Sequence, residues 1–361
     1  MPSEREFTAG LLRSSARAYA SATLHTLHAS CPSLVDTALP PTFARPIDDL
    51  EVRLLQISAS VAVDRPALLQ DVLGWYKVAF HHRDVPSEYL AATLQAIEKT
   101  LEREMARESF ALVRRHIAAA MEGLEQAPVT QPTHLDKSAP HGETAMRFLL
   151  ANLEGRGEDA LDFIRSALSK GVSVADIQDH ILGPAQREAG RMWLMAEIPI
   201  ADEHYGTAIV ERALGLLQES LPRPAADAKV VMTMGVAGNM HDLGLRMIGQ
   251  RLQQEGFAVH HLGPNMPSTD LAWSLQDRNV DVLAMSASML MHVHGVMEAV
   301  AQIRAICDQL YGDPNAKPIM LGGRPFGICR DLHEVLGAQA GLDDVRRVGE
   351  VTAKLVEGVS A

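Results

Sequence analysis

The chain has 361 residues, a length that predicts two or three domains because a single hydrophobic core seldom extends so far. Aromatic residues make up only 4% of the composition beside 16 methionines, which favours helical and α/β packing over strand-only folds. Acidic residues outnumber basic ones by 45 to 33, and the formal charge of −12 argues against direct binding of nucleic acid. Three widely spaced cysteines, a charged N-terminus and no apolar run of membrane-spanning length predict a soluble cytoplasmic protein without disulfides.

Residues 1–125 are predicted to form an all-α domain, because apolar side chains recur at intervals of three and four residues. Three prolines stand near expected helix starts: Pro46, Pro66 and Pro86. Residues 126–142 contain three further prolines and no hydrophobic period, so this stretch is the expected linker. A second helical block, 143–222, is expected to contain about four short helices. Its expected breaks are Gly155, Gly171, Gly183-Pro184 and Pro199.

From residue 229 to 361 the pattern changes to short apolar runs separated by helix-length segments. The runs are 230–236, 257–263, 280–288 and 317–323. Such an alternation is typical of β-α-β units in which the strands of a parallel sheet are buried on both faces. We therefore expect an open, doubly wound α/β domain over 229–361, with a ligand site at the carboxyl ends of its strands.

The loop after the first apolar run has the clearest chemical signal. It contains Asn239 and His241 and reaches Gly244, where a helix is expected to start, but it lacks the nucleotide-binding pattern G-x-G-x-x-G. A histidine in such a loop is often only a structural hydrogen-bonding residue. Here, however, the Asn239 oxygen can accept from Nδ1–H of His241 and leave Nε2 free for a metal. Gly244 removes side-chain bulk nearby.

Four elements in chain order resemble the cobalamin-binding domain of methionine synthase, B12 mutases, corrinoid carriers and B12 photoreceptors. That family carries D-x-H-x-x-G, then a serine after the third strand and a Gly-Gly after the next. This sequence offers His241 with Gly244, then Gly263 in LGPNMP, then Ser286, and finally Gly322-Gly323. The resemblance covers residues 229–361 and implies a flavodoxin-like domain that binds cobalamin.

By this resemblance His241 is the lower cobalt ligand, and the nucleotide tail of the corrinoid passes Gly244, Ser286 and the two adjacent glycines. Asn239 departs from the family's aspartate, which makes His241 less basic and a weaker donor to cobalt. The family's S-x-L reads S-A-S here, and a second register beginning at Ser288 is open. We favour Ser286 because it ends the apolar run, although turn-forming roles alone would also account for these residues.

The preceding helical block is expected to be a four-helix-bundle cap over the upper face of the corrinoid. Trp193 is followed after nine residues by Glu203 and His204, with Asp202 as the expected helix cap. Singly, these are ordinary core and helix-start residues. Together they resemble the W-x9-E-H motif of adenosylcobalamin photoreceptors such as the light-dependent carotenoid repressors. The resemblance implies that Trp193 shields the adenosyl group, that Glu203 binds its ribose and that His204 adds an upper-face contact.

The resemblance implies a photoreceptor without catalytic activity, in which light cleaves the cobalt–carbon bond of adenosylcobalamin. The lost adenosyl contacts would then shift helices or subunit contacts. A homo-oligomer whose state depends on light and an unidentified downstream protein are the expected partners. Leu194 stands where the repressors carry a histidine, which excludes a bis-histidine light state through that position and leaves His204 or water for the upper cobalt site.

Other functions stay open on the sequence. A corrinoid carrier for methyl transfer, docking on a methyltransferase, is the alternative, and a regulator that senses B12 or haem in the dark is a third reading. A radical mutase is disfavoured, because a (β/α)₈ substrate barrel needs about 250 residues and the first part of the chain is expected to be helical.

The N-terminal domain lacks a helix-turn-helix with a basic recognition helix, so DNA is not the expected direct output. Near a helix end it carries residue types that can line a tetrapyrrole pocket or simply suit an exposed helix end. They are Trp75, Tyr76, His81, His82 and Arg83. The domain architecture resembles the photocobilins, which implies biliverdin as a second chromophore, with Cys31 as a weak candidate for covalent attachment.

Overall fold

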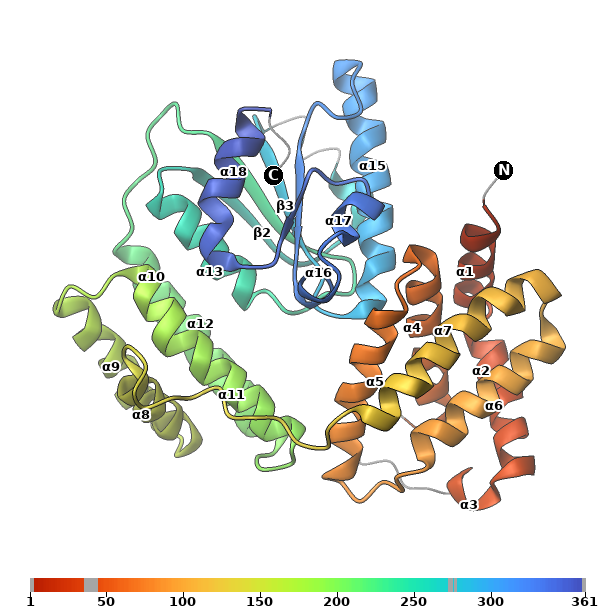
Figure 1. The fold of residues 1–361 in the computed structure, drawn as a ribbon. Coiled ribbons are helices and arrows are strands. Elements are labelled where there is room, and N and C mark those ends of the chain that lie inside the picture. Colours follow the sequence, from red (N-terminus) through yellow and green to blue (C-terminus); the bar gives the residue numbers. More distant parts are fainter. Residues whose placement is uncertain (1–2, 36–44, 272–274, 276–277, 359–361) are drawn as a thin grey trace. The chain divides into compact units, whose positions relative to one another are not determined.

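The computed structural model describes residues 3–35, 45–271, 275 and 278–358 (Figure 1). The chain forms two compact units. Unit 1 contains the chain up to Thr130 together with Met289–His294 and Ile328–Leu336, and unit 2 contains the rest. None of the helices in the described ranges has the length and apolar character that a membrane span needs.

The N-terminal part of unit 1 is helical, as the apolar periodicity predicts. Its helices are α1 (Glu4–Ser14), α2 (Ala16–Ser30), α3 (Pro32–Val35), α4 (Pro46–Val63), α5 (Pro66–His81), α6 (Tyr89–Glu104) and α7 (Arg107–Gln126). Two of the three expected prolines are the first residues of α4 and α5, where a missing N–H costs no intrahelical hydrogen bond. The third precedes α6 by three residues.

Helix α4 is the centre of unit 1 and packs against α1, α2, α5 and α7. Its Arg53 is fully buried. Nη2 of Arg53 donates to Asp49 Oδ1 at 3.2 Å, and Nη1 donates to Gln56 Oε1 at 3.0 Å. The guanidinium also lies 4.0 Å from the ring centroid of Tyr76. These contacts offset the cost of burying a charge, and the apolar period of α4 does not reveal them.

Unit 2 begins with a helical segment that we call the cap. It consists of α8 (Gly142–Leu153), α9 (Gly157–Ser169), α10 (Val174–Ile177), the π-helix η1 (Gln178–Leu182), α11 (Gly183–Leu194) and α12 (Ile200–Glu219). The expected break at Gly183-Pro184 is wrong, because η1 continues directly into α11. The N–H of Gly183 donates to the carbonyl of Gln178 five residues back, and Pro184 continues the helix as the second residue of α11.

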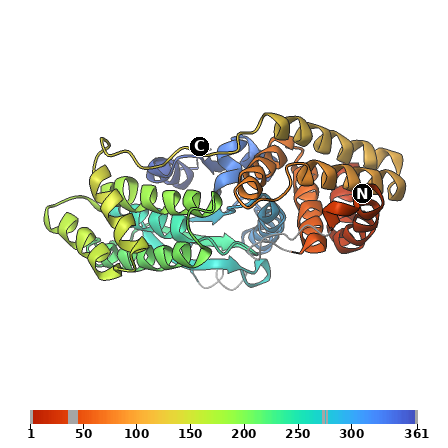
Figure 2. The ribbon, with the colours of Figure 1, turned by 90° about the horizontal axis from the view of Figure 1, so that it is seen from below.

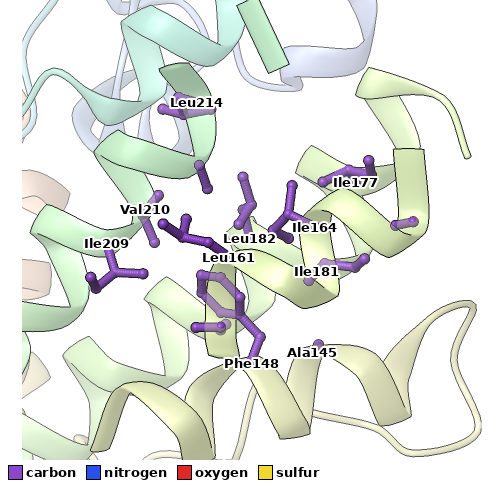
Figure 3. Close-up of a cluster of buried hydrophobic side chains, with 14 of the residues drawn as sticks. Ala145, Phe148, Leu161, Ile164, Ile177, Ile181, Leu182, Ile209, Val210 and Leu214 are labelled. Carbon is purple, nitrogen blue, oxygen red and sulfur yellow. The ribbon is translucent and has the colours of Figure 1, made fainter. Parts of the chain in front are cut away.

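The cap has its own hydrophobic core. Figure 3 shows that side chains from α8, α9, η1 and α12 point toward one another, among them Phe148, Ile164, Leu182 and Val210. Each is nearly inaccessible to solvent, and full burial of such a side chain stabilises the fold by roughly 1.5–3 kcal/mol. This core holds α11 and α12, the two helices that carry the Trp-Glu-His motif.

The second part of unit 2 is a five-stranded parallel sheet. Its strands are β1 (Val230–Val236), β2 (Ala258–Met266), β3 (Val282–Ser286), β4 (Ile319–Gly322) and β5 (Ala340–Leu342), in the order β2-β1-β3-β4-β5. The four predicted strands and the flavodoxin-like order are confirmed. The sequence did not predict β5, because three residues are too few to form a recognisable apolar run.

Helices cover the sheet on both faces. In Figure 1, α13 (Leu243–Gln254) and α18 (Val348–Val356) lie on one side of the strands and α15 (Val293–Tyr311) on the other. The remaining short elements are α16 (Arg324–Ile328), α17 (Leu332–Val335) and the 3₁₀ turns η2 (Ser268–Asp270), η3 (Leu290–His292) and η4 (Val345–Arg347). Helices α10 and α12 of the cap contact α13. In Figure 2, which is seen from below, the cap helices lie in front of the strands of the sheet.

Candidate functional site

The carboxyl ends of β1 and β3 meet where the chain reverses its direction across the sheet. From β1 the chain passes through α13 to β2, and from β3 it passes through α15 to β4 on the opposite side. Gly235 of β1 pairs with Ser286, the last residue of β3, and Ser286 pairs with Gly322 of β4. Open α/β sheets bind ligands at such a crevice. The structure therefore brings Ser286 and Gly322 together at the expected binding edge.

Asn239 fastens the ends of β1 and β3 to each other. Its side chain is completely buried, and Nδ2 donates to the carbonyl of Ser286 at 2.9 Å and lies 3.4 Å from its Oγ. Its Oδ1 accepts from the backbone N–H of His241 at 3.2 Å. The expectation that this oxygen binds Nδ1–H of His241 is wrong in this structure, because a turn of only two residues brings the backbone amide to it instead. Asn239 thus shapes the loop that presents His241.

His241 is exposed between β1 and α13, and within the described parts of the chain its imidazole has no hydrogen-bond partner. The described residues also contain no group of three or more His, Cys, Asp or Glu side chains that could hold a metal ion. A metal that brings four equatorial ligands of its own, as cobalt does in a corrin, needs only one nitrogen from the protein. His241 fits that requirement.

The neighbouring carboxylate, Asp242, contacts Arg246 and His261 and not the imidazole of His241. It is buried, accepts from Nε of Arg246 at 2.8 Å and lies 3.6 Å from Nε2 of His261. Nδ1 of His261 is 2.9 Å from the hydroxyl of Thr233. Burial and the nearby Arg246 hold the pKa of His261 below its usual range, although Asp242 opposes this shift. This polar cluster joins β1, β2 and α13, and sequence reasoning missed it because its members are far apart in the chain.

The glycines of the motif differ in how much space a side chain would have at each position. At Gly244, in the first turn of α13, an added Cβ would meet nothing within 4 Å, so the space beside His241 is open. Gly263 has φ +87° and is likewise uncrowded; it lies within β2, not at the strand end we expected. Gly323 has φ +113°, and its Cβ would lie 2.1 Å from the carbonyl oxygen of Ala287. Gly323 is therefore required by the fold itself, whereas Gly244 leaves room for a ligand.

The C-terminal end of β2 supports the loop after β1. The side-chain oxygen of Asn265 accepts from the N–H of Gly238 at 2.7 Å, and the N–H of Asn265 donates to the carbonyl of Asn239 at 2.9 Å. Asn265 has φ 53°, a left-handed conformation that asparagine tolerates better than most residues. The turn-forming residues of GPNMP were the available signal for this role.

Glu203, on α12, is held by three side chains of the cap. Its Oε1 accepts from Nε2 of Gln186 and from the hydroxyl of Thr207, both at 3.0 Å. Its Oε2 is 2.8 Å from Nδ1 of His204. The Glu203 side chain is 18% exposed and that of His204 is 72% exposed. The structure thus brings Glu203 and His204 together and places Trp193, which is half-buried, near the end of α11.

The structure also shows where Asp202 and Leu194 lie. Asp202 does not cap α12, because the helix already begins at Ile200 after the extended Pro199; Asp202 lies in the first turn, where its charge still suits the helix dipole. Leu194 is buried, as its apolar side chain favours. In this chain, a buried leucine thus stands at the position where the carotenoid repressors carry a histidine.

The loop between Trp193 and Glu203 is fixed by Arg191. Its guanidinium donates to Glu197 in this loop at 2.8 and 2.9 Å and to Glu188 of α11 at 2.8 Å. Glu188 also accepts from the backbone N–H of His134 at 2.6 Å. This part of the expected linker is thereby attached to the cap.

Polar side chains connect the cap with α13. Nε2 of Gln178, in the π-helix, donates to Oε1 of Gln250 at 2.8 Å, and Nε2 of Gln250 donates to the carbonyl of Leu214 at 2.7 Å. Arg251 also forms an ion pair with Asp179. Helix α13 begins two residues after His241. These contacts therefore join the cap to the helix that directly follows His241.

The candidate tetrapyrrole residues of unit 1 are only partly brought together. Trp75 and Tyr76 pack edge to face with centroids 5.1 Å apart. Nε2 of His82 lies 3.0 Å from the carbonyl of Val129, and the Arg83 guanidinium donates to the carbonyl of Ala79 in the last turn of α5 at 3.0 Å. His81 is exposed and packs edge to face on His82, and Cys31 is a half-buried free thiol. The contacts of His82 and Arg83 are those of a helix end that is fastened to the following chain.

Two family models match this chain. Residues 229–357 match the B12 binding domain, and residues 145–218 match a second family of the same description. The first match contains the sheet, His241 and the motif glycines, and the second contains most of the cap with Trp193, Glu203 and His204.

Relatives and a solved structure agree with these matches. The chain is 22% identical over 169 residues to dimethylamine corrinoid protein 2 of Methanosarcina mazei, covering 45% of this chain and 77% of that protein. It is 24% identical over 207 residues to the HTH-type transcriptional repressor CarH of Myxococcus xanthus, covering 56% of this chain and 65% of the repressor. The monomethylamine corrinoid protein of Methanosarcina barkeri shares the fold, with a TM-score of 0.52 at 20% identity over 60% of this chain and 100% of that one. Residues 145–218 and 229–357 of this chain are therefore similar to B12 binding domains.

Proposed function

We propose that this chain is a B12-dependent photoreceptor and signalling protein that binds adenosylcobalamin between the cap and the α/β segment of unit 2. The observation that carries the proposal is the Glu203 carboxylate, which three cap side chains hold in one orientation. A fixed, mostly buried carboxylate suits a hydroxyl-bearing upper ligand such as an adenosyl ribose. A methyl group offers that carboxylate nothing to bind.

The lower face of the corrinoid is assigned to residues of the sheet edge. Nε2 of His241 would hold cobalt, and Asn239 fixes the backbone of His241. The open space at Gly244, together with Ser286 and Gly322, would accommodate the nucleotide tail. Gly263 and Gly323 shape the neighbouring loops.

The upper face is assigned to the cap. Oε2 of Glu203 would accept a hydrogen bond from the ribose, Trp193 would cover the adenosyl group, and His204 would add a contact from the exposed side. Adenosylcobalamin, when bound, would supply a light-sensitive cobalt–carbon bond. Trp193 and Glu203 would have different contacts with and without the adenosyl group, and this difference would bias the cap toward another arrangement.

The output is a change of conformation or oligomeric state. Helices α10 and α12 contact α13, so a shift in the cap reaches the helix that follows His241. We propose a homo-oligomer and an unidentified downstream protein as partners, without catalysis by this chain. The formal charge of −12 disfavours naked DNA as the direct partner.

A corrinoid carrier for methyl transfer is the second candidate. The similarity to the dimethylamine corrinoid protein, 22% identity over 169 residues, favours it beside the 24% identity over 207 residues with the repressor. A carrier presents its cobalt to a partner enzyme, so the cap would not discriminate between adenosyl and methyl ligands. The Trp193, Glu203 and His204 set would then be structural.

Dark binding separates the two candidates. The photoreceptor proposal predicts that the protein binds adenosylcobalamin more tightly than methylcobalamin, and that Glu203→Ala weakens only adenosylcobalamin binding. Loss of a hydrogen bond to a charged group costs about 1.5–3 kcal/mol, or roughly tenfold to a hundredfold in Kd. Equal affinities for both cofactors, unchanged by Glu203→Ala, would support the carrier.

Biliverdin as a second chromophore stays a prediction that rests on the architectural resemblance alone. Incubation of the protein with biliverdin in the dark should give a far-red absorption band that Trp75→Leu weakens. A spectrum identical to that of free biliverdin would contradict this prediction.

A further inference from the structure

Gln186 and Thr207 form a closed hydrogen-bonded ring with Oε1 of Glu203. The amide of Gln186 donates to Oε1 of Glu203 at 3.0 Å and to the hydroxyl of Thr207 at 2.6 Å. The hydroxyl of Thr207 donates to the same Oε1 at 3.0 Å. All three side chains are half-buried, so the ring lies only partly in contact with solvent.

The ring makes the two oxygens of Glu203 unequal. Oε1 accepts two hydrogen bonds from the cap, whereas Oε2 accepts one, from Nδ1 of His204. A carboxylate oxygen accepts about two hydrogen bonds. Oε2 is therefore the oxygen with capacity left for a hydroxyl donor.

We infer that Gln186 and Thr207 are positioning residues that determine selectivity for the adenosyl form of B12 by fixing Glu203 so that Oε2 faces the ligand. This inference rests on the proposed function. Gln186 belongs to α11 and Thr207 to α12, so the ring also ties together the two helices that carry Trp193 and Glu203. An unfixed glutamate would lose side-chain freedom on each binding event, which lowers affinity.

The test compares dark dissociation constants for adenosylcobalamin and methylcobalamin, measured by equilibrium dialysis. Gln186→Leu and Thr207→Val each remove one side of the ring and keep Glu203. The loss of one neutral hydrogen bond of about 0.5–1.5 kcal/mol predicts a weakening of adenosylcobalamin binding by roughly twofold to tenfold. Methylcobalamin binding should not change. Gln218→Leu is the control for loss of a glutamine from α12, since the Gln218 side chain bonds to Gln253 and Gln250 and not to Glu203.

A double-mutant cycle shows whether Gln186 acts through Glu203. In the Glu203→Ala background, Gln186→Leu should cause no further loss of adenosylcobalamin binding, because the group it positions is gone. Equal loss for both cofactors, or a full additional loss in the double mutant, would overturn the inference and make Gln186 a general structural residue. Unchanged binding by both ring variants would overturn it as well.

The outcomes also separate this inference from the proposed function. If Glu203→Ala lowers adenosyl selectivity and the ring variants do not, only the inference fails. If the wild-type protein has no adenosyl preference and Glu203→Ala has no effect, the proposed function fails and the inference with it. Thermal unfolding of each variant without cofactor identifies any variant that is misfolded. If one of the two ring variants is misfolded, the dissociation constants of the other test the inference.

Discussion

Nδ2 of Asn239 donates to the backbone carbonyl of Ser286 at 2.9 Å and so joins the ends of β1 and β3. An aspartate at this position would have no N–H for that carbonyl. The departure from the family's D-x-H-x-x-G pattern is therefore built into the hydrogen bonding of this sheet edge.

Asn239→Asp should destabilise the protein, although it restores the family's residue. The variant places a carboxylate oxygen against the Ser286 carbonyl in a buried site, which should lower the free energy of unfolding by about 1–3 kcal/mol. Ser286→Ala is the control, because it removes only the longer 3.4 Å contact and keeps the carbonyl. Urea unfolding of the two variants checks this, and equal stability of Asn239→Asp and wild type would refute it.

His241 should be the axial nitrogen ligand of bound cobalamin. In the electron paramagnetic resonance spectrum of protein-bound cob(II)alamin, an axial nitrogen splits each cobalt line. Labelling the protein with ¹⁵N while the cofactor stays ¹⁴N should change the splitting from three lines to two. In labelled protein the two-line splitting should be lost in His241→Ala and persist in His204→Ala. A three-line pattern from labelled protein would mean that the cofactor's own base remains bound.

Gly244→Ala should separate ligand binding from stability. The added Cβ meets nothing within 4 Å, and alanine is favoured in a helix by up to about 1 kcal/mol, so the cofactor-free protein should be as stable as wild type or more stable. A methyl group in the path of the corrinoid tail should weaken binding by roughly tenfold, an overpacking cost of about 1–3 kcal/mol. Unchanged affinity would show that no ligand passes Gly244.

Gly323→Ala should behave in the opposite way. Its Cβ would lie 2.1 Å from the Ala287 carbonyl oxygen at φ +113°, so the fold itself should lose about 3 kcal/mol or more before any ligand is added. At the adjacent Gly322 the nearest atom would be 3.7 Å away, and Gly322→Ala should leave the cofactor-free protein much closer to wild type. Thermal unfolding without cofactor compares the two, and equal melting temperatures would contradict this expectation.

His116 should make the stability of unit 1 depend on pH. Its Nδ1 lies 2.7 Å from the Ser60 hydroxyl; burial first, and then the nearby Arg115, lowers the pKa of His116 to about 4. The unfolded chain, with a pKa near 6.5, then binds more protons between pH 6.5 and 4. The free energy of unfolding is therefore unaffected above about pH 6.5 and falls below it, by about 3 kcal/mol when pH 4 is reached.

Urea unfolding at pH 7.5 and at pH 5 tests this dependence. Other groups also titrate in this range, so the informative quantity is the difference between wild type and His116→Gln. The variant should lose less stability than wild type on acidification. An identical pH dependence in both proteins would exclude His116 as the source.

The sequence predicted those parts of the molecule that follow from hydrophobic periodicity. Buried parallel strands are continuous apolar runs, so β1 to β4 were found and Ser286 was recognised as the end of its run. The strand β5 was not, because three residues carry too little pattern. The continuation through Gly183-Pro184 was missed because a π-helical turn tolerates residues that usually end a helix.

The finer structure of the site depends on contacts between residues that are distant in sequence. The motif identified Glu203 but not its ring with Gln186, because nothing local indicates that α11 and α12 face each other at that point. The Asp242–His261 contact was hidden for the same reason. The side-chain oxygen of Asn239 was assigned to Nδ1–H of His241 but accepts from the backbone N–H of His241, a choice that only the backbone geometry makes.

The most direct test of the photoreceptor proposal is illumination of the protein loaded with adenosylcobalamin in the dark, followed by absorption spectroscopy and size-exclusion chromatography of both states. We predict that green light converts the cobalamin spectrum and changes the elution volume, and that protein loaded with methylcobalamin does not show the same change in elution. Photolysis of the bound cofactor with no change in elution volume or in any other measure of conformation would contradict a light-sensing role.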